Sequence, residues 1–114
     1  MDDLIKKLEQ SISRDDFIDI AYDIVDELDE LDDAVRAVAP ILKLMETHPD
    51  VDFGTPGPLV HFVEQFYRAG YEEQLLLSLK RCPTEHMVWM MRRVLNGMSE
   101  SEQQRFITDL SHLL

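Results

Sequence analysis

The chain is poor in the residue types that mark secreted, membrane-spanning and nucleic-acid-binding proteins. Its 114 residues include one cysteine, one tryptophan, four glycines and five prolines, with 11 basic side chains against 23 acidic ones. The lone cysteine, Cys82, cannot form an internal disulfide, which disfavours a small disulfide-stabilised domain. Apolar runs such as Leu75, Leu76 and Leu77 are only a few residues long. A bilayer span needs about 20 apolar residues, so no transmembrane helix is expected.

The excess of acidic residues disfavours two classes of partner. A protein that binds DNA or RNA brings cations to the phosphates, and a formal net charge of -12 opposes this. The same charge opposes binding to an anionic membrane surface. The first residues, Met1, Asp2 and Asp3, lack the basic region and apolar run of a signal peptide. We therefore expect a cytoplasmic protein that binds neither nucleic acid nor membrane.

Length and composition predict one folded domain over residues 1–114. Chains of about 100 to 150 residues typically form a single hydrophobic core. Hydrophobic residues make up 45% of the chain and charged residues 30%, which is ordinary for a globular protein and too apolar for a disordered acidic chain. A single compact unit is therefore expected.

Apolar residues in the first half of the chain recur at helical spacing. They predict a helix over residues 2–11, a longer helix opened by Ser13 as N-cap, and a third helix over residues 33–46 that Pro40 kinks or splits. The inward stripe of the long helix is predicted to comprise Phe17, Ile20, Ala21, Ile24, Leu28 and Leu31. The inward residues of the third helix are predicted to be Val35, Val38, Leu42 and Met45.

Three prolines and two glycines make residues 48–58 the one long irregular connection. Four further helices are predicted after it, over residues 58–69, 71–81, 84–96 and 99–113. Gly70 and Gly97 fit left-handed positions at helix ends, and Ser99 with Glu102 forms a capping box.

The predicted fold class is all-α, with six or seven helices in antiparallel hairpins, because the links between the later helices are short. Both a small helical bundle and a HEAT-like stack satisfy this pattern. The expected core includes Phe62, Phe66, Trp89, Val94 and Phe106, with Trp89 largely buried.

Most of the net charge lies in one segment. Residues 15–33 contain ten acidic side chains and no basic one, which is ten of the twelve net negative charges. A helix here places its apolar stripe on one side and gathers acidic residues on the other. The predicted partner-binding residues are Asp16, Asp19, Asp23, Asp26, Glu27 and Glu30. Like charges at this spacing cost about 0.2–0.5 kcal/mol per pair, so a basic partner explains the face better than solubility alone, although a solvated face is the other interpretation.

Signals for catalysis or metal binding are sparse. His61 and Glu64 lie three apart on one predicted helix and His86 begins another, but zinc sites need at least three converging protein ligands. A packed, hydrogen-bonded histidine is the competing interpretation. No motif of a nucleophilic cysteine surrounds Cys82. We therefore interpret it as a small structural residue at a helix end. The segment from Met87 to Met91 suits buried core better than an adaptable binding surface. The sequence therefore predicts no enzyme, no cofactor and no metal.

Two segments carry a resemblance to a known group of proteins. They are DFGTPGPLVHFVE, from Asp52 to Glu64, and RCPTEHMVWMMRRVLN, from Arg81 to Asn96. These segments resemble small helical bacterial proteins, the immunity proteins of polymorphic toxin systems, including contact-dependent growth inhibition. The resemblance covers about residues 52–96 and brings no catalytic residues with it. It implies a cytoplasmic antitoxin that binds the C-terminal toxin domain of a secreted effector, often a nuclease.

Three functions are therefore considered. The first is an immunity protein that neutralises a basic toxin domain through the acidic face. The second is a non-catalytic helical adaptor that binds another protein. The third is a small metal-dependent enzyme using His61, Glu64 and His86.

Overall fold

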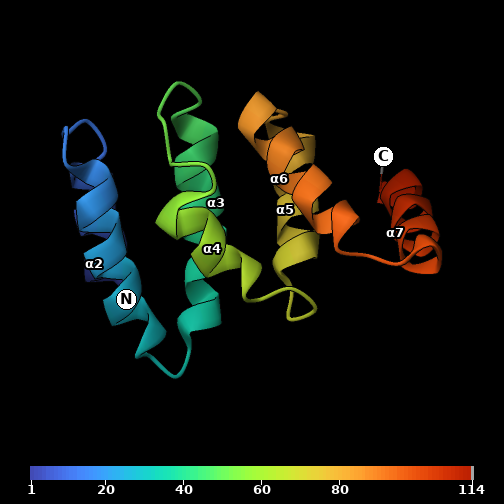
Figure 1. The fold of residues 1–114 in the computed structure, drawn as a ribbon, viewed down its shortest axis with the longest axis horizontal. Helices are drawn as coiled ribbons and strands as arrows, with labels where there is room; N and C mark the ends of the chain where they lie inside the picture. The colour runs from blue at the N-terminus through green and yellow to red at the C-terminus, as the bar shows by residue number, and fades with distance from the viewer. Residues whose placement is uncertain (114) are drawn as a thin grey trace.

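A computed structural model gives the fold, and it describes residues 1–113 (Figure 1). Within this range the chain is all helical, as the sequence predicts. Its elements are α1 (Asp2–Gln10), α2 (Phe17–Asp29), the 3-10 helix η1 (Ala34–Ala37), α3 (Val38–Thr47), α4 (Gly57–Glu64), α5 (Tyr71–Arg81), α6 (Glu85–Asn96) and α7 (Glu100–Leu113).

The helices form a two-layer stack. One layer contains α1, α3 and α5, and the other contains α2, α4 and α6. Contacts run along the layers, between α1 and α3, α3 and α5, and α2 and α4, and across them within the hairpins. In Figure 1, α4 lies in front of α3 and α6 in front of α5, with α7 at the far end of the row. Contacts between helices two apart are typical of a HEAT-like stack, and the all-helical arrangement also fits a small helical bundle.

The start of α2 differs from the sequence prediction. Ser13 does not cap this helix, which begins at Phe17 with Asp16 in the N-cap position. The carboxylate of Asp16 accepts hydrogen bonds from Arg14 instead of capping the helix. The predicted inward stripe is confirmed at Phe17 and at Ala21, Ile24 and Leu28, while Ile20 and Leu31 are partly buried.

The third predicted helix is split, but at a different place from Pro40. The 3-10 helix η1 ends at Ala37, and α3 starts at Val38, so Pro40 lies in the first turn of α3. A proline is tolerated there because the first backbone N–H groups of a helix have no intrahelical acceptor. Val35, which was predicted to point inward, is 41% exposed on η1.

The helix that was predicted over residues 58–69 ends earlier, at Glu64. Arg68 takes a left-handed conformation in the following turn, and its backbone N–H donates to both carboxylate oxygens of Glu72 at 3.0 and 2.9 Å. This buried carboxylate stabilises the turn before α5. Gly70 is left-handed as predicted, whereas Gly97 has a φ of -83° and does not use the conformation that was expected of it.

The loop over residues 48–56 carries a buried aromatic side chain into the core. Phe53 is 2% exposed and packs edge-on against Phe17 of α2 at 6.1 Å between ring centroids. The following turn contains Gly54 in a left-handed conformation and a cis peptide bond before Pro56. A Cβ on Gly54 would lie 2.6 Å from the Cα of Gly57, so only glycine fits.

The expected core is confirmed in part. Phe62 and Val94 are buried, but Phe66, Trp89 and Phe106 are only partly buried and lie against the edge of the core. Trp89 packs against the core but is not among its fully buried residues, so its prediction as a core residue is confirmed only in part. The large aromatic residues that fill the interior are Phe53, Phe62 and Tyr71.

Two carboxylates join neighbouring helices of the same layer across long sequence distances. Glu46 of α3 accepts hydrogen bonds from Ser78 and, at 2.8 Å, from Arg81 of α5. Glu64 of α4 forms two hydrogen bonds with Arg93 of α6. No described helix is long and apolar enough to cross a membrane.

Core and edge aromatic residues should differ in their contribution to stability. We expect Phe62→Ala to lower the free energy of unfolding by about 3 to 5 kcal/mol, because it empties a buried site. Trp89→Ala should cost less, because part of the indole ring is already exposed to water. Urea denaturation of the two variants checks this, and an equal or larger loss for Trp89→Ala would contradict the packing described here.

Candidate functional site

The acidic surface lies on the outer side of α2. It is defined by the six residues Asp16, Asp19, Asp23, Asp26, Glu27 and Glu30, all of which are exposed. The opposite side of the same helix is buried, with Ala21, Ile24 and Leu28 at 0% exposure. The two sides follow from the helical period, since residues three and four apart share a face. The structure therefore gathers all the predicted binding residues on or beside one exposed helix face.

The charges of the acidic surface are mostly uncompensated. Asp16 is paired with Arg14 at 2.9 Å, and this hydrogen bond lowers the pKa of Asp16. The other five members form no ion pair with any side chain that the structure describes. Nearby, Asp29 accepts a hydrogen bond from the Gln65 side chain at 2.9 Å. Negative charge is thus concentrated on α2 and available to an external cation.

An exposed aromatic ring accompanies these charges. Tyr22 is 51% exposed and belongs to the same helix, three residues after Asp19 and four before Asp26. Residues at these spacings are neighbours on a helix surface. The sequence analysis did not single out Tyr22. The sequence does indicate it, because Tyr22 lies outside the apolar stripe, where burial in the core does not explain a large aromatic ring.

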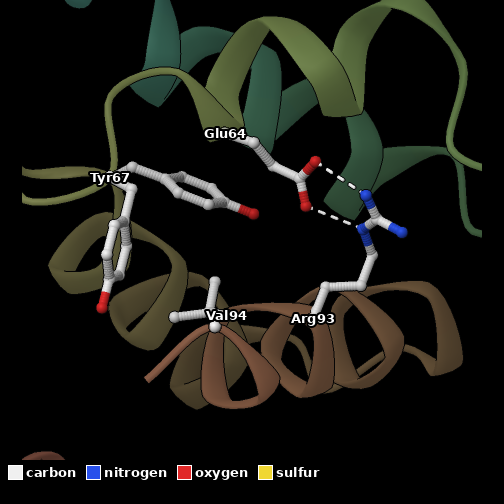
Figure 2. A pocket seen from close by; sticks show the side chains of 6 residues that line it. Glu64, Tyr67, Arg93 and Val94 are labelled. Atoms are coloured by element: carbon white, nitrogen blue, oxygen red, sulfur yellow. Dashed lines mark hydrogen bonds and ion pairs between the residues drawn. The ribbon is translucent and has the colours of Figure 1, made fainter. Parts of the chain in front are cut away.

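The three residues considered for metal chemistry do not converge. The Nδ1 atom of His61 lies 3.9 Å from Glu64, but the carboxylate of Glu64 is held by Arg93 at 2.7 and 3.0 Å (Figure 2). His86 instead packs between the rings of Phe53 and Trp89. Among the side chains that the structure describes, no group of three from His, Cys, Asp or Glu could hold a metal ion. The positions of the three residues therefore contradict the hypothesis that they form one metal site.

The environment of His86 favours its neutral form. The ring centroids of Phe53 and Trp89 lie 5.4 and 5.5 Å from that of His86. Its Nε2 atom is buried and has no hydrogen-bond partner in the part of the chain that is described. Burial lowers the pKa of His86 below 6.5, and the charge of Asp52 opposes this only in part. His86 therefore acts as a packing residue that a proton would disturb.

The single cysteine and the methionines of α6 occupy structural positions. Cys82 ends α5, where its thiol lies 3.7 Å from the backbone carbonyl oxygen of Glu46. Met87, Met90 and Met91 are buried, which confirms the interpretation of this segment as core. Val88, on the same helix, is 38% exposed.

His86 should make stability depend on pH. Because its folded pKa is lowered, its contribution is fully present above the unfolded value of about 6.5 and is lost as pH falls toward the folded value. We expect the free energy of unfolding to fall as the pH drops below about 6.5, and to fall less in His86→Gln. The control is His61→Gln, which removes an exposed imidazole and should keep the parent profile. An equal fall in the free energy of unfolding with pH for the parent and His86→Gln would contradict this explanation.

Comparison with known proteins supplies no further guide to the site. No family model, no curated protein and no solved structure matches this chain. Its function must therefore be argued from its surface and its charge.

Proposed function

We propose that this chain is a cytoplasmic immunity protein that neutralises a toxin domain of nuclease type from a contact-dependent growth inhibition effector. It binds that domain through the acidic surface on α2 and performs no chemistry of its own. The observation that carries the proposal is the row of exposed carboxylates, unpaired among the described residues except for Asp16, opposite a fully buried stripe on the same helix. The resemblance of residues 52–96 to immunity proteins supports the same partner.

Charge complementarity gives a physical route to inhibition. A nuclease holds phosphates with lysine and arginine side chains, so its substrate-binding surface is cationic. A carboxylate-covered helix can occupy that surface and exclude the nucleic acid by competition. Complementary charge also accelerates the encounter and fixes its orientation. Inhibition of this kind needs affinity and no reacting group.

The acidic surface is already rigid before it meets a partner. The backbone of α2 is fixed before binding, since its buried face is packed against α1 and α4. Little conformational entropy is then lost on association, compared with a disordered acidic tail. Tyr22 adds a ring of the kind that dominates binding energy at the centre of many interfaces. Carboxylates around the ring would set the orientation of the complex.

Neutralising the acidic surface should weaken binding without weakening the fold. The variant combines Asp23→Asn, Asp26→Asn, Glu27→Gln and Glu30→Gln. Asp19 is kept because it lies in the first turn of α2, where negative charge stabilises the helix. We expect association with the toxin domain to slow by about tenfold or more at low salt, with a smaller effect at high salt. Stopped-flow mixing measures the rate, and co-expression with the toxin measures protection.

A matched control separates the effect of where the charges lie from the effect of the total charge. It combines Glu9→Gln, Asp50→Asn, Glu73→Gln and Glu85→Gln, four exposed residues outside α2. Because Glu73 and Glu85 lie in the first turns of α5 and α6, the thermal midpoint of the control is expected to fall slightly. The control should bind and protect nearly as the parent does. The thermal midpoint of the α2 variant should stay or rise, since like charges are removed. Undiminished binding by the α2 variant, or equal losses in both variants, would contradict the proposal.

Tyr22 should contribute to binding through contact area and not through charge. We expect Tyr22→Ala to weaken equilibrium binding about tenfold or more, as truncation of a central interface aromatic does. The salt dependence of association should remain that of the parent, because no charge changes. Isothermal titration calorimetry at two salt concentrations checks this. Unchanged affinity would place Tyr22 outside the interface.

A non-catalytic adaptor is the alternative function. In this alternative, the same helical stack and acidic surface bind a protein other than a toxin. An adjacent upstream reading frame for a large secreted protein with a toxic C-terminal domain favours the immunity protein. Failure of the parent chain to protect cells from that domain would favour the adaptor.

A further inference from the structure

A pocket opens between α4, α5 and α6, away from the acidic surface (Figure 2). Its volume is about 230 Å³. An engineered apolar cavity of about 150 Å³ holds benzene, so this pocket has room for one substituted ring. The lining residues are Glu64, Tyr67, Tyr71, Arg93, Val94 and Gly97.

Tyr71 lines this pocket and carries a buried polar atom that has no partner within the described part of the chain. The residue is 1% exposed, and its hydroxyl oxygen is buried with no hydrogen-bond partner among the described residues. Burial raises the pKa of this hydroxyl, and the charge of Glu64 raises it further, so it remains a hydrogen-bond donor. An unpaired buried hydroxyl costs the desolvation energy of that group, which an acceptor on a ligand would offset.

The two charged residues of the pocket balance each other. The Nε atom of Arg93 donates to one carboxylate oxygen of Glu64 at 2.7 Å, and a terminal nitrogen donates to the other at 3.0 Å. Figure 2 shows this two-point pairing at the edge of the pocket. A charged ligand would have to face one like charge or break the pair. The geometry therefore favours a neutral occupant.

We propose that the pocket is a binding site for a small neutral aromatic molecule with an accepting oxygen, of the phenol class, which receives the hydrogen bond of Tyr71. Its ring would lie against Tyr67 and Val94, which supply aromatic and aliphatic surface. This site is independent of the toxin-binding proposal, because it involves no residue of α2.

Entry requires a small movement of the pocket wall. The Tyr71 oxygen is covered by its neighbours, so an acceptor cannot approach it while every side chain stays in place. The movement that the proposal requires is a shift of Glu64 and Arg93, whose side chains are 22% and 35% exposed and extend from two different helices.

The test is a titration of the full chain, labelled with ¹⁵N, with three probes: phenol, benzene and benzoate. Phenol should give saturable amide shifts at residues 64–71 and 93–97, and benzoate should give none there. Tyr71→Phe should weaken phenol binding about two- to tenfold, the range for one net hydrogen bond, and leave benzene binding unchanged. The matched control is Tyr22→Phe, which removes the hydroxyl of an exposed tyrosine on α2 outside the pocket and should keep the parent affinity for phenol.

Several outcomes would overturn the proposal. They are an absence of saturable shifts at the pocket, equal phenol binding by the parent and Tyr71→Phe, and benzoate binding as tight as phenol binding. The thermal midpoint gives a second readout, since Tyr71→Phe should keep or raise it. A marked fall would mean that the hydroxyl is already satisfied within the fold, which removes the basis for a ligand there.

Discussion

The packing of the α2 apolar stripe against α1 and α4 is the interaction on which the acidic surface depends. Ala21, Ile24 and Leu28 are completely buried, and this fixes the rotation of the helix about its own axis. A helix so fixed can place its carboxylates only on the outer side. Repulsion among those carboxylates is tolerated because burial of the stripe contributes far more, at roughly 1.5–3 kcal/mol for each large side chain.

The two halves of the chain hold together in different ways. The ion pairs formed within the first half are local, such as Arg14 with Asp16, and most of its charges lie on the surface. The second half adds ion pairs that join helices, from Glu46 to Arg81 and from Glu64 to Arg93. The pocket beside the second pair and the acidic surface on α2 therefore belong to separate parts of the stack, and each can be altered without the other.

Local signals explain which parts of the fold could be predicted. The bounds of α5 match the prediction, and α6 starts after Thr84, whose side chain accepts a hydrogen bond from the backbone N–H of Met87. Ser99 and Glu102 form the predicted cap of α7. These features depend on residues a few positions apart. The acidic surface was predictable for the same reason, because its residues share one helix.

Features that depend on distant residues could not be read from the sequence. The ion pair of Glu64 with Arg93 spans 29 residues, and that of Glu46 with Arg81 spans 35. Nothing local indicates that Phe53, in an irregular loop, enters the core while Trp89 stays at its edge. The burial of Tyr71 beside the pocket likewise appears only once three helices are assembled.

The central claim is that the outer face of α2 is the surface that meets the partner. The most direct measurement maps the amide resonances of the ¹⁵N-labelled chain as unlabelled toxin domain is added. The account predicts that the largest changes fall on residues 16–30, including Tyr22, and that α5, α6 and α7 change little. Changes concentrated on the loop over residues 48–56 and the later helices, with α2 unaffected, would contradict it.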